Sequence, residues 1–231
     1  MKTIGSTIIM LALASSLFAD NGKELKLASP DGTHEIVFYQ KQVSPAVNEL
    51  CYRVDYKSQP VVNESRAGLE LDNRIWEMAL GVRNLKQPAC WMDNLEVDSV
   101  TYQPETNLTW QPLYGERSSV HDHYRAGTLC LSKKDNSGYR LNIEVRAYNE
   151  GVAFRYFFPE HPKAIFHKVV GDLTEYALPA GTKAWTEQWA QAFFERLNID
   201  DIKHPVERAL TFELPNGKWA ALADADVDAG A

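Results

Sequence analysis

The chain has 231 residues, of which 45% are apolar, and a formal net charge of −7 at pH 7. This apolar content is ordinary for a soluble globular protein and supplies enough side chains for a hydrophobic core. A surface that neutralises phosphates has to be basic, and the longest basic clusters here are pairs such as Lys133-Lys134. Composition therefore excludes a nucleic-acid partner.

Residues 1–19 have the pattern of a secretory signal peptide. Lys2 precedes an apolar run from Ile8 to Leu13, and small residues follow up to Ala19. The apolar run is shorter than the roughly 20 residues that span a membrane. We therefore expect an exported protein without a membrane span, in the periplasm, on the cell surface or in the medium. The mature chain, residues 20–231, is expected to be one domain.

In the first half of the mature chain, alternation of apolar and polar residues predicts strands. Residues 34–40 follow the turn sequence Ser29-Pro-Asp-Gly32, and residues 50–56 and 67–71 are further candidates. Residues 75–80 are one of two short helical candidates.

In the second half, residues 127–131 and 139–148 flank turn residues and predict a β-hairpin. Residues 139–148 form the clearest half-buried strand, with Leu141, Ile143, Val145 and Ala147 on one face. Gly151 begins a tight turn into a strand at 152–158. Further candidates are strands at 165–170, 183–185, 210–214 and 219–222, and a short helix at 190–197. Many short strands with few helices predict an all-β sandwich or barrel.

Three cysteines, Cys51, Cys90 and Cys130, lie far apart in the sequence. Exported chains can form disulfides, but the number is odd and no C-x-x-C spacing is present. One disulfide and three small buried thiols are both compatible with this pattern.

The stretch Trp110 to Tyr124 contains His121-Asp-His123. Two histidines separated by one residue share a face of a strand and could bind zinc or copper if further ligands lay nearby. The alternative is a pair of hydrogen-bonded structural histidines.

No motif of nucleophilic or nucleotide chemistry is present. The sequence lacks a G-x-S-x-G elbow, a local Cys-His signature and a glycine-rich phosphate loop. Glycosidases use paired carboxylates, and Glu187 and Glu195 stand in the aromatic-rich segment 185–195. Aromatic rings beside carboxylates suit sugar binding, and a buried aromatic cluster is the simpler alternative.

Several segments together resemble the N-terminal domain of glycoside hydrolase family 97, which comprises exported bacterial α-glucosidases and α-galactosidases. They are, in this order, residues 27–32, Trp110–Glu116, His123-Tyr124 and Tyr148–Tyr156. The resemblance covers about residues 25 to 223 and implies a β-super-sandwich of the galactose-mutarotase-like type. It also indicates a structural role for Trp110 to Tyr124, with Gly115 allowing a bend and Glu116 and His123 making internal hydrogen bonds.

The resemblance further implies that a (β/α)₈ barrel follows this domain and supplies the catalytic acid and the base or nucleophile. No catalytic residue is then expected in this chain. In the family, the N-terminal domain lends a glutamate to an active-site calcium ion, and Glu195 is its best match, with Glu187 in reserve. The local sequence departs from the family pattern, because it lacks a Pro-Gly and a flanking Tyr-Asp run.

Three functions are carried forward. The first is the N-terminal domain of a calcium-dependent α-glycosidase acting on oligosaccharides, inactive alone and incomplete at its C-terminus, where residues 220–231 end without a partner strand. The second is a stand-alone carbohydrate-binding module that uses Trp185, Trp189 and Phe193 for stacking. The third is a mutarotase-type sugar epimerase, which needs an acid-base pair in the concavity of the sandwich.

Overall fold

The computed structural model describes residues 23–81, 91–133, 137–163 and 166–225. The predicted signal peptide, Cys90 and part of the predicted hairpin turn before Gly138 lie outside these residues. No helix in the described part of the chain has the length and apolar content that a membrane span requires.

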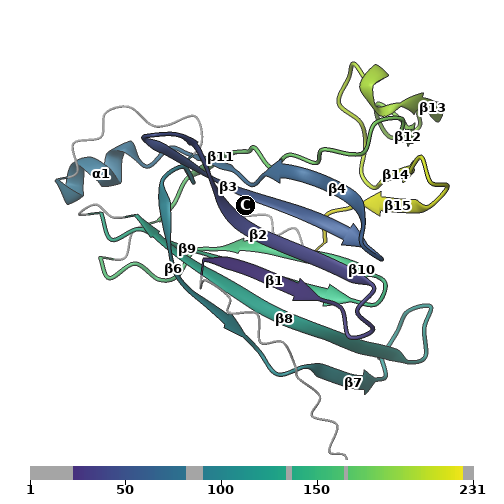
Figure 1. Cartoon of the computed structure of the whole chain (residues 1–231), viewed down its shortest axis with the longest axis horizontal. Helices are drawn as coiled ribbons and strands as arrows, with labels where there is room; N and C mark the ends of the chain where they lie inside the picture. The colour runs from purple at the N-terminus through teal and green to yellow at the C-terminus, as the bar shows by residue number, and fades with distance from the viewer. Residues whose placement is uncertain (1–22, 82–90, 134–136, 164–165, 226–231) are drawn as a thin grey trace, which may run out of the picture.

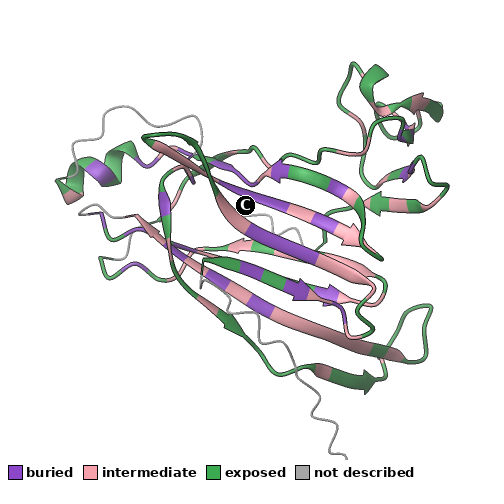
Figure 2. Cartoon of the chain, viewed as in Figure 1, coloured by how far each residue is buried: buried purple, intermediate pink, exposed green. Residues whose placement is uncertain are grey.

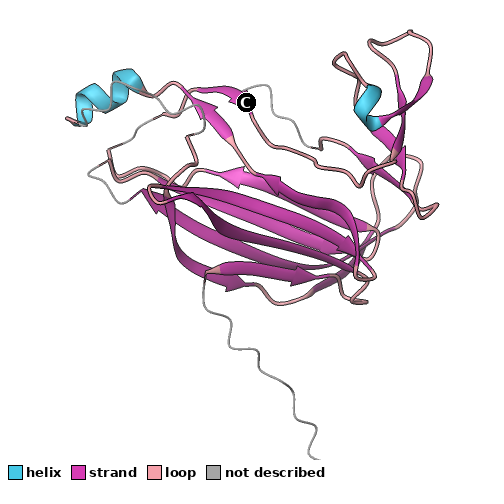
Figure 3. Ribbon diagram, turned by 45° about the horizontal axis from the view of Figure 1, so that its top comes forward, coloured by secondary structure: helices cyan, strands magenta, loops and turns pink. Residues whose placement is uncertain are grey.

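Two antiparallel sheets face each other and form a sandwich (Figures 1 and 3). The first sheet has the order β1–β2–β3–β4, made of β1 (Glu24–Ala28), β2 (His34–Ser44), β3 (Val47–Tyr56) and β4 (Gln59–Arg66). The second has the order β10–β9–β8–β6, with β7 also paired to β8. Its strands are β6 (Leu95–Tyr102), β7 (Thr106–Trp110), β8 (Val120–Lys133), β9 (Arg140–Tyr148) and β10 (Gly151–Phe157).

Two smaller sheets complete the molecule. In one, β5 (Leu69–Leu71) pairs with β11 (Val169–Asp172), and helix α1 (Arg74–Leu80) follows β5. The other has the order β13–β12–β14–β15 and is called the small sheet below. Its elements are β12 (Lys183–Thr186), β13 (Glu195–Asn198), a 3₁₀ turn (Ile199–Asp201), β14 (Leu210–Glu213) and β15 (Trp219–Leu222).

The main core lies between the facing sides of the two large sheets, where the buried residues alternate along the strands (Figure 2). In β9, Leu141, Ile143, Val145 and Ala147 are all buried, as their alternation predicts. Gly127 of β8 allows β1 to come close, because a Cβ there would stand 3.1 Å from Leu25 Cδ1. The all-β prediction is confirmed.

Three details differ from the sequence-based expectations or resolve them. The helix predicted at 190–197 is wrong, because the chain turns after Trp189 and then pairs with β12 as β13. The strand predicted at 165–170 forms later, at Val169–Asp172. Cys51 is buried and Cys130 half-buried, and both are free thiols. Burial raises the pKa of Cys51 to about 11, so its thiol is inert at neutral pH.

Candidate functional site

A pocket of about 500 Å³ opens on the small sheet and brings together the two glutamates singled out in the sequence. The chain leaves β12, turns, returns as β13 and continues past the 3₁₀ turn, so that residues from all three stretches line one hollow. The polar and aromatic lining includes Glu187, Trp189, Phe193, Glu195, Asp201 and His204.

Glu195 is the first residue of β13 and lies opposite Thr186 of β12. The Thr186 hydroxyl donates a hydrogen bond of 3.4 Å to the backbone carbonyl of Glu195. Glu187 follows β12 directly, and its carbonyl accepts the Glu207 N–H at 2.9 Å. Backbone contacts therefore fix both residues. Their carboxylates make no hydrogen bond or ion pair with the described residues.

These two carboxylates alone do not make a metal centre. The described residues contain no group of three or more His, Cys, Asp or Glu side chains able to hold a metal ion. Calcium takes six to eight oxygen ligands. Glu187 and Glu195 alone therefore supply too few oxygens for a calcium ion.

The aromatic residues near the pocket divide into two groups. Trp185 stacks on Trp219 with ring centroids 4.4 Å apart, and Arg196 lies over it. Trp185 belongs to the packing of the small sheet and does not line the pocket. Trp189 and Phe193 do line it, and they are 60% and 94% exposed. The three-residue stacking platform expected from the sequence is therefore reduced to two rings.

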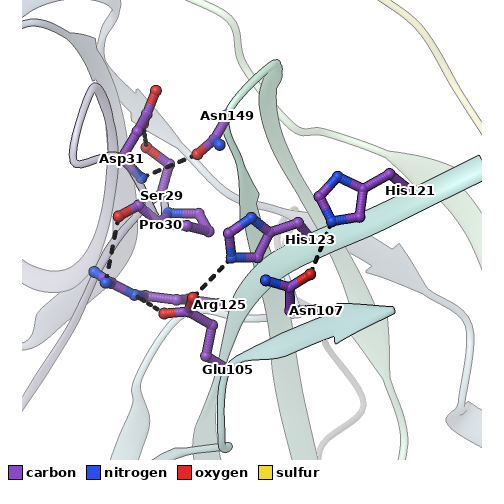
Figure 4. Close-up of polar contacts among 9 residues, drawn as sticks. All are labelled: Ser29, Pro30, Asp31, Glu105, Asn107, His121, His123, Arg125 and Asn149. Atoms are coloured by element: carbon purple, nitrogen blue, oxygen red, sulfur yellow. Dashed lines mark hydrogen bonds and ion pairs between the residues drawn. The ribbon is translucent and has the colours of Figure 1, made fainter. Parts of the chain in front are cut away.

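His121 and His123 lie on one face of β8, with ring centroids 5.5 Å apart (Figure 4). His121 Nε2 donates to Asn107 Oδ1 at 2.8 Å, and His123 Nε2 donates to Glu105 Oε1 at 2.7 Å. Each imidazole is thus hydrogen-bonded within the domain. This geometry agrees with structural histidines and leaves no three-ligand metal site among the residues that the structure describes.

Glu105 connects these histidines to other segments of the sandwich (Figure 4). Its second oxygen accepts from Arg125 Nε at 2.9 Å, and the Arg125 guanidinium also reaches the carbonyl of Pro30 at 3.4 Å. The hydrogen bond from His123 and then that from Arg125 lower the pKa of Glu105. The network ties the β6–β7 connection and β8 to the β1–β2 turn.

The same turn is also fastened to the β9–β10 turn. Asp31 N–H donates to Asn149 Oδ1 at 3.0 Å. The hydroxyl of Ser29 and the N–H of Thr33 hold the pKa of Asp31 at about 2.

The loop between β7 and β8 bears out part of its prediction. Gly115 has a φ of 119°, which L side chains rarely adopt, so the bend expected at this glycine is confirmed. Glu116 is exposed and makes no side-chain hydrogen bond within the described residues, so the internal bond expected for it is wrong. Leu113 and Tyr114 of this loop are 100% and 90% exposed, so none of the described residues covers their side chains.

Sequence reasoning missed Asp201 and His204, which line the pocket from beyond β13. Only the return of the chain after the 3₁₀ turn places them there. No spacing in the sequence marked them.

Comparison with known proteins places this geometry in a family. The model of the family described as Glycosyl-hydrolase 97 N-terminal matches residues 27–229. A curated protein, the retaining alpha-galactosidase of Bacteroides thetaiotaomicron, is 26% identical over 178 residues, 77% of this chain and 22% of that protein.

Solved structures agree in fold. A glycoside hydrolase family 97 enzyme of Pseudoalteromonas sp. strain K8, in complex with panose, matches with a TM-score of 0.69 and 24% identity. That match covers 84% of this chain and 27% of the enzyme. A β-arabinopyranosidase matches with a TM-score of 0.66 and 17% identity, over 88% of this chain and 32% of the other. The chain thus spans less than a third of each relative, and it belongs to the N-terminal domains of glycoside hydrolase family 97.

Proposed function

We propose that this chain is the N-terminal domain of an exported, calcium-dependent α-glycosidase that acts on oligosaccharides with α-glucosidic or α-galactosidic bonds. A (β/α)₈ barrel in the same enzyme supplies the catalytic acid and the base or nucleophile. The domain packs on that barrel, forms one wall of its sugar pocket and contributes Glu195 to the calcium ion. By itself the domain is inactive.

The observation that carries this proposal is the pair of unpartnered carboxylates at the pocket of about 500 Å³. Glu195 and Glu187 keep their oxygens free, although the domain pairs many other acidic side chains with arginine or lysine. Two carboxylates supply at most four oxygens, so a calcium ion held here needs further ligands from a second domain. Family membership supports a glycosidase, and the galactosidase name belongs to the relative alone.

The test uses the complete gene product and nitrophenyl α-glucoside and α-galactoside as substrates. We expect a chelator to abolish hydrolysis and calcium to restore it. Glu195→Gln should raise the calcium concentration for half-maximal activity by about tenfold or more, because one charged ligand is lost. Glu116→Gln, an exposed glutamate without side-chain partners, is the matched control. Hydrolysis that survives chelation, or equal calcium dependence in both variants, would overturn the proposal.

A stand-alone carbohydrate-binding module is the second candidate, and the exposed rings of Trp189 and Phe193 favour it. Such rings can stack on the apolar faces of sugars. Titration of the chain with malto-oligosaccharides, followed by tryptophan fluorescence, separates the two functions. Saturable binding that Trp189→Ala removes would favour the module.

The mutarotase-type alternative needs an acid-base pair, and His123 with Glu105 is the nearest arrangement to one in the described residues. The lowered pKa of Glu105 makes its carboxylate a weak base. Arg125 also occupies its second oxygen. We therefore do not favour an epimerase.

A further inference from the structure

At one end of the second sheet, β7 and the first part of β8 form a two-stranded ribbon. Among the residues that the structure describes, β7 pairs only with Val120–Tyr124 of β8, and β9 pairs with β8 only from Tyr124 onward. Four of the five residues of β7 are exposed, and Figures 1 and 2 show this strand at the outer margin of the sheet. A two-stranded ribbon is only marginally stable in water, so a further strand would stabilise it.

The outer edge of β7 has open backbone groups. A strand at the edge of a sheet presents N–H and C=O groups of alternate residues to its free side. No backbone hydrogen bond joins residues 106–110 to a described segment other than β8. The backbone groups on the free side of β7 can therefore pair with another strand.

Two other edges of the large sheets are covered within the chain. On β4, Asn63 N–H donates to the Ala177 carbonyl at 2.8 Å, so the segment that follows β11 pairs with that edge. On β1, Lys26 N–H donates to the Tyr102 hydroxyl at 3.4 Å. Neither of these edges is as open as the outer edge of β7.

The remaining edges of the second sheet carry features that discourage pairing with another chain. Charged side chains, proline and β-bulges have this effect on an edge strand. β10 contains Arg155, and β6 contains Glu96, Asp98 and a bulge between Val97 and Ser99. β7, with the sequence Thr-Asn-Leu-Thr-Trp, has no charge, no proline and no bulge. Its edge is therefore unprotected.

The sequence of β7 suits antiparallel pairing with a second copy of itself. If Leu108 stands opposite Leu108 of the second copy, Asn107 stands opposite Thr109, and Thr106 opposite Trp110. Leu108 and Trp110 are two residues apart and share one face of the strand, where they are 62% and 51% exposed. Large side chains also reach their diagonal neighbours across a strand pair. The two leucines and two tryptophans would therefore form one apolar strip.

Charge also favours pairing of β7 with its own copy. The residues that flank β7, Glu105 and Gln111, would stand opposite each other, so no like charges would meet across the pair. The Glu105 carboxylate is in addition paired with Arg125 at 2.9 Å. An uncharged edge gives a strongly charged partner nothing to bind, whereas it accepts a second uncharged edge.

We propose that two copies of the protein associate by antiparallel pairing of β7 with β7 about a two-fold axis at Leu108. The second sheets of the two copies then join into one continuous sheet. In such an interface the same surface patch meets itself, and addition of a strand to an open sheet edge is a recurring mode of association. The loop that directly follows β7 adds Leu113 and Tyr114, which no described residue covers. The inference does not depend on the proposed function.

The competing edge is β15 in the small sheet, which also lacks a charged residue. β15 has four residues, and Lys218 directly precedes it. Asp224, which follows β15 closely, forms an ion pair with Arg208. Short length and flanking charges both discourage pairing at an edge. Its exposed residue Ala221 provides a matched position for a control variant.

The experiment measures self-association of the complete gene product by analytical ultracentrifugation. We expect the parent to form a concentration-dependent dimer. Leu108→Lys and Leu108→Glu, each alone, should raise the dissociation constant of the dimer by about tenfold or more, because like charges would face each other across the axis. An equimolar mixture of the two variants should form dimers again, because a lysine would then face a glutamate. Ala221→Lys should dimerise like the parent.

Three outcomes would overturn the inference. The first is a parent that stays monomeric at every concentration, or a dimer that both Leu108 variants leave intact. The second is a dimer that only Ala221→Lys dissociates, which would move the contact to β15. The third is a mixture of the two Leu108 variants that stays monomeric, because the two copies of residue 108 would then not face each other. Leu108 is exposed, so neither variant creates a core defect, and recovery of the dimer in the mixture also shows that both variants fold.

Discussion

Among single residues outside the candidate pocket, Glu105 joins two side chains of β8 through its two carboxylate oxygens. One carboxylate oxygen holds His123 and the other holds Arg125, which reaches on to the carbonyl of Pro30 (Figure 4). The hydrogen bonds from His123 and Arg125 are strengthened by the charge of this one carboxylate. Its ionisation therefore links local order at this end of the sandwich to pH.

Replacing Glu105 by Gln should lower the melting temperature at neutral pH, because the hydrogen bonds to His123 and Arg125 lose their charge. The pKa of Glu105 is lowered from 4.5 in the folded protein. Its contribution to stability is therefore complete above pH 4.5 and disappears as the pH falls through the folded-state pKa. Calorimetry between pH 7 and pH 3 should show the two melting curves converging in acid. Glu116→Gln should have the melting temperature of the parent at every pH. If the melting temperature of Glu105→Gln stayed below that of the parent by the same amount at every pH, the predicted pH dependence would be wrong.

The close packing around Gly127 leads to a second prediction for a single residue. An added Cβ would stand 3.1 Å from Leu25 Cδ1 and 3.3 Å from Tyr102 Cδ1, tighter than ordinary contact. Gly127→Ala should therefore destabilise the domain by about 1–3 kcal/mol in urea denaturation, as overpacked cores do. Gly151→Ala is the control, because nothing lies within 4 Å of its Cβ. An unchanged free energy of unfolding in Gly127→Ala would show that β1 can move away from residue 127 at little cost.

Among elements, strands buried on one face were the easiest to predict. β9 alternates without a break between buried and more exposed residues, and the structure keeps that pattern. β8 extends over Val120–Lys133, although only residues 127–131 were predicted. Its first part was missed because it carries polar side chains and pairs with the exposed strand β7. The helix prediction at 190–197 was wrong because it also ignored a partner strand. Pairing with β12 fixes residues 195–198, and sequence periodicity does not report such a long-range partner.

The segment that leads into β11 is held by an imidazole in an aromatic cluster. His167 stacks on Phe158 at 4.3 Å, lies 5.8 Å from the Trp91 ring, and accepts a hydrogen bond from Asn73 Nδ2 on Nδ1 at 2.9 Å. Burial, and then the nearby His161, lower the pKa of His167 to about 4. The folded protein therefore keeps this imidazole neutral where an unfolded chain would protonate it.

Stability should consequently fall between pH 6.5 and about pH 4, since the unfolded chain binds the proton first. Because the side chain is only partly buried, we expect a loss of about 1–2 kcal/mol over this interval. Urea denaturation of the parent and of His167→Phe at both pH values measures it. The variant should lose less stability than the parent over the interval. Equal losses would mean that His167 titrates normally in the fold.

For the whole molecule, the proposed calcium site makes a prediction about the chain on its own. Glu187 and Glu195 lack a third metal-binding partner among the described residues. The chain of 231 residues should therefore bind calcium only weakly, with a Kd above roughly 10⁻⁵ M, and hydrolyse no α-glycoside. Isothermal titration and a chromogenic assay test this, with Glu195→Gln as the baseline for binding. A micromolar site in the chain would mean that the domain assembles its own calcium centre.

The sequence could predict this site only in part. Chain order placed Glu187 and Glu195 in one aromatic-rich segment, and the resemblance to family 97 assigned Glu195 a role. The stacking of Trp185 on Trp219, which removes Trp185 from the pocket, depends on β15 and on pairing across the small sheet. Such contacts between distant segments cannot be predicted from composition or from the local sequence pattern.

Residues 166–177, called the strap below, pair with β4 and β5 and thereby affect the order of folding. Its backbone hydrogen bonds join Glu175 to Arg66 and Ala177 to Asn63 across more than a hundred residues of chain. Closing so long a loop carries an entropic cost that nearby hairpins such as β9–β10 avoid, so the strap pairs late. Until then a nascent chain leaves the edge of β4 and β5 unpaired and open to other strands. During synthesis this edge is therefore a point at which the unfinished chain can aggregate.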